Sequence, residues 1–144
     1  MVTLILFRGA AVLLALGAVA HTLGGMLGTA RKGPGAGPDA DRVLADMRSI
    51  RFEWRGAQCT WYGFWMGNGL SVSALLVLPV ALLWLLGTTT PGAAGPLLPL
   101  AWIVTSTLGL LSALGARYFA TRVGVVFGLV ALLAGAGTLL LAAG

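Results

Sequence analysis

The stretch DMRSIRFEWRGAQCTWYGFWMGNG, residues 46–69, decides how this chain is organised. Its first half carries charge, including Glu53, and its second half sets Gln58 and Asn68 among aromatic side chains. The only cysteine, Cys59, lies in that second half. Most of the chain around it is Leu, Ala, Val and Gly. The stretch therefore marks the passage from a charged surface helix into an apolar span.

The composition indicates an integral membrane protein. Of the 144 residues, 58% are hydrophobic and 9% are charged. A soluble domain carries about 25% charged residues, so this chain could not cover a globular surface with polar groups. At about 20 residues per span, four spans and their loops use the whole chain. We predict one all-α domain over residues 1–144, a four-helix transmembrane bundle with spans at about 3–27, 58–86, 97–116 and 123–143.

A short amphipathic helix is expected before the second span. The Gly/Pro-rich linker 29–38 ends just before Asp39 and Asp41, either of which can cap a helix. Within residues 39–56, apolar side chains recur at helical spacing at Val43, Met47, Ile50 and Trp54. This spacing predicts a cytoplasmic helix that lies on the membrane surface and runs into the second span.

The basic residues predict the topology. Arg8 is one of nine, and the other eight flank the linker after the first span and the turn after the third: Arg31, Lys32, Arg42, Arg48, Arg51, Arg55, Arg117 and Arg122. Positive loops stay in the cytoplasm, so both connections are expected inside a bacterial inner membrane and both termini outside. Basic residues placed in this way suit anionic lipid better than nucleic acid, so we expect no nucleic-acid partner.

Three glycine pairs at GxxxG spacing lie on the first, second and fourth spans: Gly24/Gly28, Gly63/Gly67 and Gly124/Gly128. Small residues let helix backbones approach closely where lipid supplies no hydrophobic drive. Together the pairs predict a tightly packed bundle.

His21, the only histidine, lies in the first span. A polar side chain in lipid needs a partner, and an intramembrane imidazole can also shuttle protons. A histidine that only hydrogen-bonds to a neighbouring helix is the alternative, and both interpretations stay open. One histidine and one cysteine do not form a recognisable metal or haem ligand set, so we expect no metal and no cofactor.

The start of the second span holds the candidate ligand-binding residues. They share a stripe near the membrane depth of His21 and comprise Gln58, Trp61, Tyr62, Trp65 and Asn68. Aromatic walls with a few polar groups are typical of a small-molecule site, here close to the cytoplasm. An interfacial aromatic belt explains Trp61 and Tyr62 equally well, and Trp65 and Asn68 less well.

Two further residues are candidates at the same end of the bundle. Glu53 could act with His21 as a catalytic acid–base pair, or form a solvated salt bridge with Arg51 or Arg55. Arg117 could bind an anionic lipid head group, or serve only as a topology determinant.

Three short motifs, HTLGG at residues 21–25, MRSIRF at 47–52 and YGF at 62–64, resemble an uncharacterised family of small bacterial four-span membrane proteins. The resemblance covers the chain and implies the same fold, with no function to transfer. The chain is also similar in composition, although in no ordered motif, to sterol-isomerase-type membrane domains.

Three functions are consistent with these patterns. The first is binding of an apolar or lipid-like molecule in the aromatic/polar pocket, with or without isomerase- or cyclase-type acid–base chemistry. The second is a non-catalytic accessory subunit bound to a membrane-protein partner, which suits glycine-rich helix faces. A small transporter is the weakest, because the spans lack a charged path.

Overall fold

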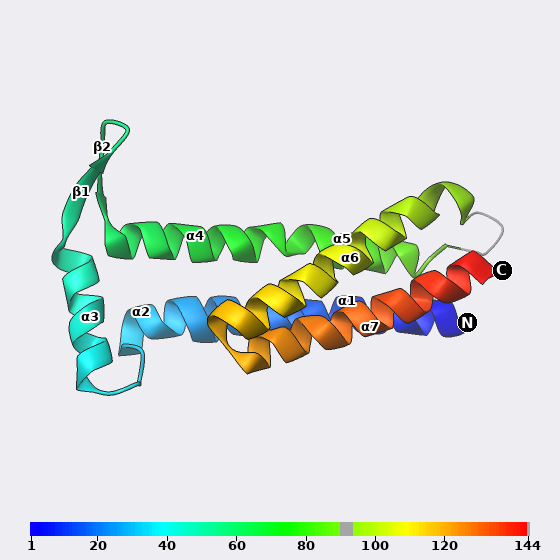
Figure 1. Cartoon of the computed structure of the whole chain (residues 1–144), viewed down its shortest axis with the longest axis horizontal. Coiled ribbons are helices and arrows are strands. Elements are labelled where there is room, and N and C mark those ends of the chain that lie inside the picture. The colour runs from blue at the N-terminus through cyan, green and yellow to red at the C-terminus, as the bar shows by residue number, and fades with distance from the viewer. Residues whose placement is uncertain (90–93, 144) are drawn as a thin grey trace. The chain divides into compact units, whose positions relative to one another are not determined.

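The computed structural model describes residues 1–89 and 94–143 and is almost entirely helical (Figure 1). Four of its helical segments are long and apolar enough to cross a membrane: Val2–Lys32, Trp61–Leu86, Gly95–Phe119 and Thr121–Ala143. This confirms the all-α, four-span architecture, and it fits a multi-pass membrane protein. The chain packs as two compact units, Met1–Gly17 with Leu76–Gly144, and Ala18–Leu75, which we describe in turn.

The first unit is made of apolar helices. Its elements are the first sixteen residues of α1 (Val2–Val19), α5 (Val77–Leu86), η3 (Gly95–Leu97), α6 (Leu98–Leu114), η4 (Gly115–Phe119) and α7 (Thr121–Ala143). Figure 1 shows α6 and α7 running side by side, and the short π-helix η4 leads into the turn between them. Its fully buried side chains come from α1, α5, α6 and α7 and include Phe7, Leu14, Leu83, Leu86, Leu108 and Val130.

Close backbone approach holds η4, which follows α6, against α7, and hydroxyl groups join α6 itself to α7. A methyl group on Gly124 would lie 2.7 Å from the backbone nitrogen of Ala116. The hydroxyl of Ser112 donates a 2.7 Å hydrogen bond to the carbonyl oxygen of Gly124. Further from the η4 turn, the hydroxyl oxygens of Thr105 in α6 and Thr138 in α7 are 3.3 Å apart, and Thr138 is fully buried. The small-residue packing predicted for the last glycine pair is therefore present.

The second unit connects the first and second spans. It contains the π-helix η1 (Ala20–Gly28), α2 (Thr29–Lys32), α3 (Pro38–Ser49), β1 (Arg51–Trp54), β2 (Ala57–Thr60) and α4 (Trp61–Leu75). The other two predicted glycine pairs, Gly24/Gly28 and Gly63/Gly67, lie in this unit, and they do not bring two helix backbones close together within it. Among the described residues, nothing lies within 4 Å of a methyl group built on Gly24 or Gly67, and only the Thr60 hydroxyl approaches one built on Gly63.

The surface helix exists but is shorter than predicted. It ends at Ser49, and a β-hairpin follows in which Phe52 pairs with Cys59 and Glu53 with Gln58. Its two-residue turn places Arg55 at φ 51° and Gly56 at φ 82°, the positive angles that tight hairpin turns require. The expected helix through Trp54 was wrong, because residues 51–54 form β1. The second span was predicted from about residue 58, and α4 begins at Trp61, directly after β2.

The α6–α7 contact predicts a difference between two glycine-to-alanine variants. Gly124→Ala places a methyl group against the Ala116 backbone and should destabilise the protein by about 1–3 kcal/mol. Gly109→Ala, on the same helix pair, meets nothing within 4 Å and should leave stability unchanged or slightly raised. Thermal unfolding in detergent measures both, and equal melting temperatures for the two variants would contradict the packing described.

Candidate functional site

The first candidate, His21, is hydrogen-bonded within the second unit. It lies in η1 and is half-buried, with Nε2 3.3 Å from the carbonyl oxygen of Gly69 in α4. Because a carbonyl oxygen only accepts, this hydrogen bond requires the proton on Nε2. Met26 packs on the same glycine, which is buried. These contacts match the packing interpretation of His21, and its role in proton transfer stays a prediction.

Two hydroxyl groups extend this contact between η1 and α4. The hydroxyl of Thr22 lies 2.8 Å from both the Ser73 hydroxyl and the Ala18 carbonyl oxygen. Ser73 donates in turn to the Gly69 carbonyl oxygen at 3.1 Å. The carbonyl of Gly69 therefore accepts from both an imidazole and a hydroxyl, and these polar groups of the two helices are hydrogen-bond partners of one another.

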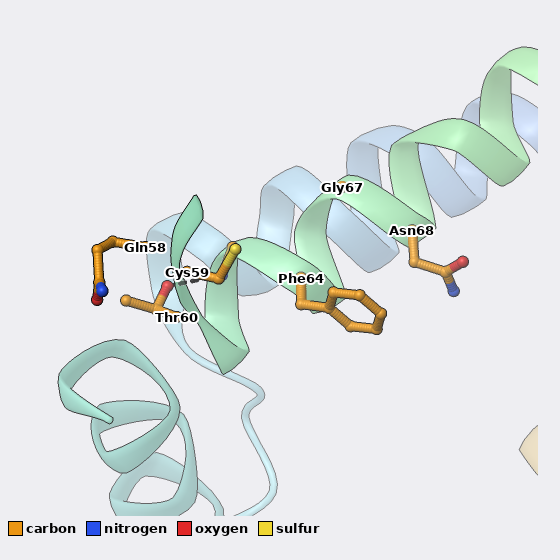
Figure 2. Close-up of a pocket in the computed structure, with 7 residues that line it drawn as sticks. Gln58, Cys59, Thr60, Phe64, Gly67 and Asn68 are labelled. Atoms are coloured by element: carbon orange, nitrogen blue, oxygen red, sulfur yellow. Dashed lines mark hydrogen bonds between the residues drawn. The ribbon is translucent and has the colours of Figure 1, made fainter. Parts of the chain in front are cut away.

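An open pocket of about 620 Å³ lies where the hairpin meets α4 (Figure 2). Its lining comes from the end of β2 and the first turns of α4: Gln58, Cys59, Thr60, Gly63, Phe64, Gly67 and Asn68. Figure 2 shows the side chains of Phe64 and Asn68 projecting from the same side of α4. Gly63 and Gly67 lack side chains, so they leave the helix surface open between the larger residues.

The junction that shapes the pocket is fixed by a helix cap. The hydroxyl oxygen of Thr60 accepts a 3.0 Å hydrogen bond from the backbone N–H of Gly63. This satisfies one of the free donors in the first turn of α4, as threonine commonly does at a helix start. Because β2 leads directly into α4, the cap also fixes where Gln58 and Cys59 lie relative to the helix.

An aromatic cluster adjoins the pocket through Phe64. The Phe52 ring lies 4.7 Å from the Trp61 ring and 6.5 Å from the Phe64 ring, measured between centroids. The Trp61 and Phe64 rings meet edge to face at 6.3 Å, and each side chain is about half exposed at 49% and 53%. The cluster offers apolar surface beside the polar groups of the pocket.

Other predicted ligand residues lie away from this pocket. Tyr62 and Trp65 contact each other, with ring centroids 5.8 Å apart, and line no part of the pocket. The guanidinium group of Arg48 covers the Tyr62 ring at 4.8 Å and donates a 2.8 Å hydrogen bond to the Ala30 carbonyl oxygen. Of the predicted stripe, Gln58 and Asn68 therefore share the pocket, and Trp61 adjoins it.

Neither the predicted acid, Glu53, nor Arg117 lines the pocket, although Glu53 pairs with the lining residue Gln58 in the hairpin. Glu53 is exposed on β1 and, within residues 1–89 and 94–143, forms no ion pair with Arg51 or Arg55. Arg117 belongs to η4 in the other unit, 5.5 Å from the Tyr118 ring centroid. No group of three or more His, Cys, Asp or Glu side chains in these ranges could hold a metal ion.

Sequence reasoning missed five lining residues: Cys59, Thr60, Gly63, Phe64 and Gly67. The pair Gly63/Gly67 was interpreted as a helix contact. A usable signal was present, because a threonine such as Thr60 directly before an apolar helical run is a common helix cap. Such a cap places the end of the preceding segment beside the first turns of the helix.

The Thr22–Ser73 contact predicts a measurable coupling between two helices. In a double-mutant cycle, Thr22→Val and Ser73→Ala should show a coupling free energy of about 0.6 kcal/mol, the average for interhelical hydrogen bonds in membranes, and at most about 1.7 kcal/mol. Ser71→Ala is the matched control, because its hydroxyl bonds only to Gly67 in its own helix. Unfolding in mixed micelles gives these free energies, and additive effects for Thr22 and Ser73 would show that the contact is absent.

Comparison with known proteins adds no assignment to this geometry. No protein-family model, no curated protein and no solved structure matches the chain. The chemistry of the site is therefore argued from its own residues.

Proposed function

We propose that this multi-pass protein of a bacterial inner membrane binds an amphipathic, lipid-like molecule in the pocket at the start of α4. The observation that carries the proposal is the open surface over Gly63 and Gly67, bordered by Phe64 and by the polar groups of Gln58 and Asn68. An apolar wall with a few placed polar groups is the usual composition of a small-molecule site.

The position of the pocket along the span suits a molecule with one polar end. Trp61 begins the second candidate span, and Asn68 lies seven residues further, about 10 Å along the helix. Gln58 and Thr60 precede the span, so they face the region of lipid head groups. A ligand with its polar end at Gln58 and its chain along Phe64 would leave Asn68 as a deeper hydrogen-bonding partner.

The charge distribution supports a cytoplasmic position for this pocket. The hairpin beside it carries Arg51 and Arg55, and α3 carries Arg42 and Arg48. Basic segments that flank short connections stay in the cytoplasm, which would place both chain termini outside. Membrane lipid itself is then the most abundant source of amphipathic ligands.

The proposal is for binding and does not include acid–base catalysis. His21 and Glu53 were the predicted catalytic pair. His21 is hydrogen-bonded to Gly69, and Glu53 is exposed on the hairpin with no ion pair in the described ranges. Neither residue lines the pocket. A proton-transfer role for them has no support from a shared site.

A non-catalytic subunit is the second candidate, and the same glycines favour it. A GxxxG face that only the Thr60 hydroxyl approaches within its unit could receive a transmembrane helix of a partner protein. The two candidates differ in what occupies the face, so one substitution at Gly67 can distinguish them.

Protection of Cys59 tests lipid binding, because this only cysteine lines the pocket. In maltoside detergent, palmitoyl lysophosphatidylcholine should slow the reaction of Cys59 with a maleimide. Gly67→Val puts a side chain on the open surface and should raise the half-protecting concentration roughly tenfold, which corresponds to about 1.4 kcal/mol. Asn68→Leu should weaken protection by the loss of a polar partner.

Gly9→Val is the matched control, because Gly9 is an exposed helical glycine of the other unit with nothing within 4 Å of an added methyl group. It should leave protection unchanged. Wild-type Cys59 that reacts at the same rate with and without the lysolipid would exclude the lipid pocket. Loss of a co-purifying membrane protein from Gly67→Val, with protection unaltered, would instead support the subunit.

A further inference from the structure

Arg8 is a membrane-span arginine held in a defined position in the first unit. Its guanidinium carbon lies 4.9 Å from the centroid of the Trp84 ring, a cation–π contact. Its aliphatic stem packs on Gly87, where an added methyl group would lie 3.0 Å from the arginine Cγ. Gly87 is buried and Arg8 is half-buried. The side chain is thus fixed between a ring face and a glycine backbone.

No side-chain carboxylate of the first unit can neutralise Arg8. The four acidic residues of the sequence all lie in the segment after the first span: Asp39, Asp41, Asp46 and Glu53. Within the described residues, the buried Nε of Arg8 has no hydrogen-bond partner. A guanidinium group has five N–H donors, and a cation in a membrane span normally pairs with an anion or a polar group.

The depth of Arg8 brings a phosphate group within reach. The first candidate span, Val2–Lys32, has 31 residues, about 45 Å of helix against a hydrocarbon core of about 30 Å. Arg8 lies six residues after the start, about 9 Å along the helix, which is near the boundary between hydrocarbon and head groups. Trp84, two residues before the end of α5, is also near the end of its span, where tryptophan is enriched.

We propose that Arg8, held by Trp84 and Gly87, binds a phosphate group at the membrane face where the first span begins. The two terminal nitrogens of a guanidinium group match phosphate oxygens in a bidentate geometry, whereas the Nε of Arg8 is buried. The phosphate is that of an anionic phospholipid or a soluble phosphate. This site and the α4 pocket are formed by different residues, and neither proposal depends on the other.

Native mass spectrometry of the full-length protein in detergent tests the proposal. Phosphatidylglycerol, phosphatidylcholine and inorganic phosphate are titrated separately. Arg8→Gln should remove one tight phosphatidylglycerol site and weaken the first binding step roughly tenfold, because the charged fork is lost. Arg8→Lys should be intermediate, since it keeps the charge without the bidentate geometry. Gly87→Ala should also weaken binding, because it displaces the arginine stem.

Arg42→Gln is the matched control. It removes the same charge from an exposed arginine that pairs with Asp39 at 3.5 Å, and it should not alter the tight site. Equal losses of binding for Arg8→Gln and Arg42→Gln would show that the effect depends only on net charge, and this would overturn the proposal. Unchanged binding in Arg8→Gln would overturn it too.

The ligand arms identify the source of the phosphate. Inorganic phosphate that binds the wild type and is lost in Arg8→Gln, with no tight phosphatidylglycerol site, would indicate a soluble ligand. If Arg8→Gln fails to fold, Arg8→Lys and Gly87→Ala decide the matter. Wild-type affinity in both variants would then overturn the proposal.

Discussion

Polar groups within the spans must find partners without water, and this constraint governs the structure. The hydroxyls of Thr138 and Ser112 donate to backbone carbonyls of α7, and His21 and Ser73 share the carbonyl of Gly69. These bonds occur where small residues bring helices close, so packing and polar satisfaction are achieved at the same positions. Two places depart from the pattern. The buried Nε of Arg8 has no hydrogen-bond partner among the described residues, and the α4 pocket leaves amide groups at an open surface. Both proposals rest on those departures.

The four spans could be predicted because lipid imposes a simple compositional rule on helices. The hairpin could not be predicted from the same rule. Ile50 and Trp54 are four residues apart, as on one face of a helix, but Ile50, Phe52 and Trp54 also alternate with charged residues, as on one face of a strand. Both periods fit the segment, and Gly56 decides between them by allowing a two-residue turn. This glycine, two residues after the ambiguous segment, was the informative residue.

Only part of the candidate site could be predicted, because helical spacing alone was used to group its residues. Gln58 and Asn68 line one pocket, although the argument that joined them assumed a continuous helix that begins before Gln58. Tyr62 and Trp65 were assigned to the same stripe, but Arg48 of α3 lies over Tyr62. Sequence spacing on one helix carries no information about which neighbour covers each face. The glycine pairs show the same limit, since Gly124 meets a facing helix and Gly67 meets nothing within its unit.

The π-helical winding of η1 has a consequence for how the sequence can vary. A π-helix has more residues per turn than an α-helix, so η1 holds more of the chain in each turn than α1 does. Deleting one residue from η1 could be absorbed by rewinding towards α geometry, whereas a deletion in α4 would rotate every later side chain about the axis. The first span can therefore lose a residue in η1, the segment in which His21 and Met26 contact Gly69, and still remain helical. Length polymorphism should be tolerated in residues 20–28 and selected against in α4.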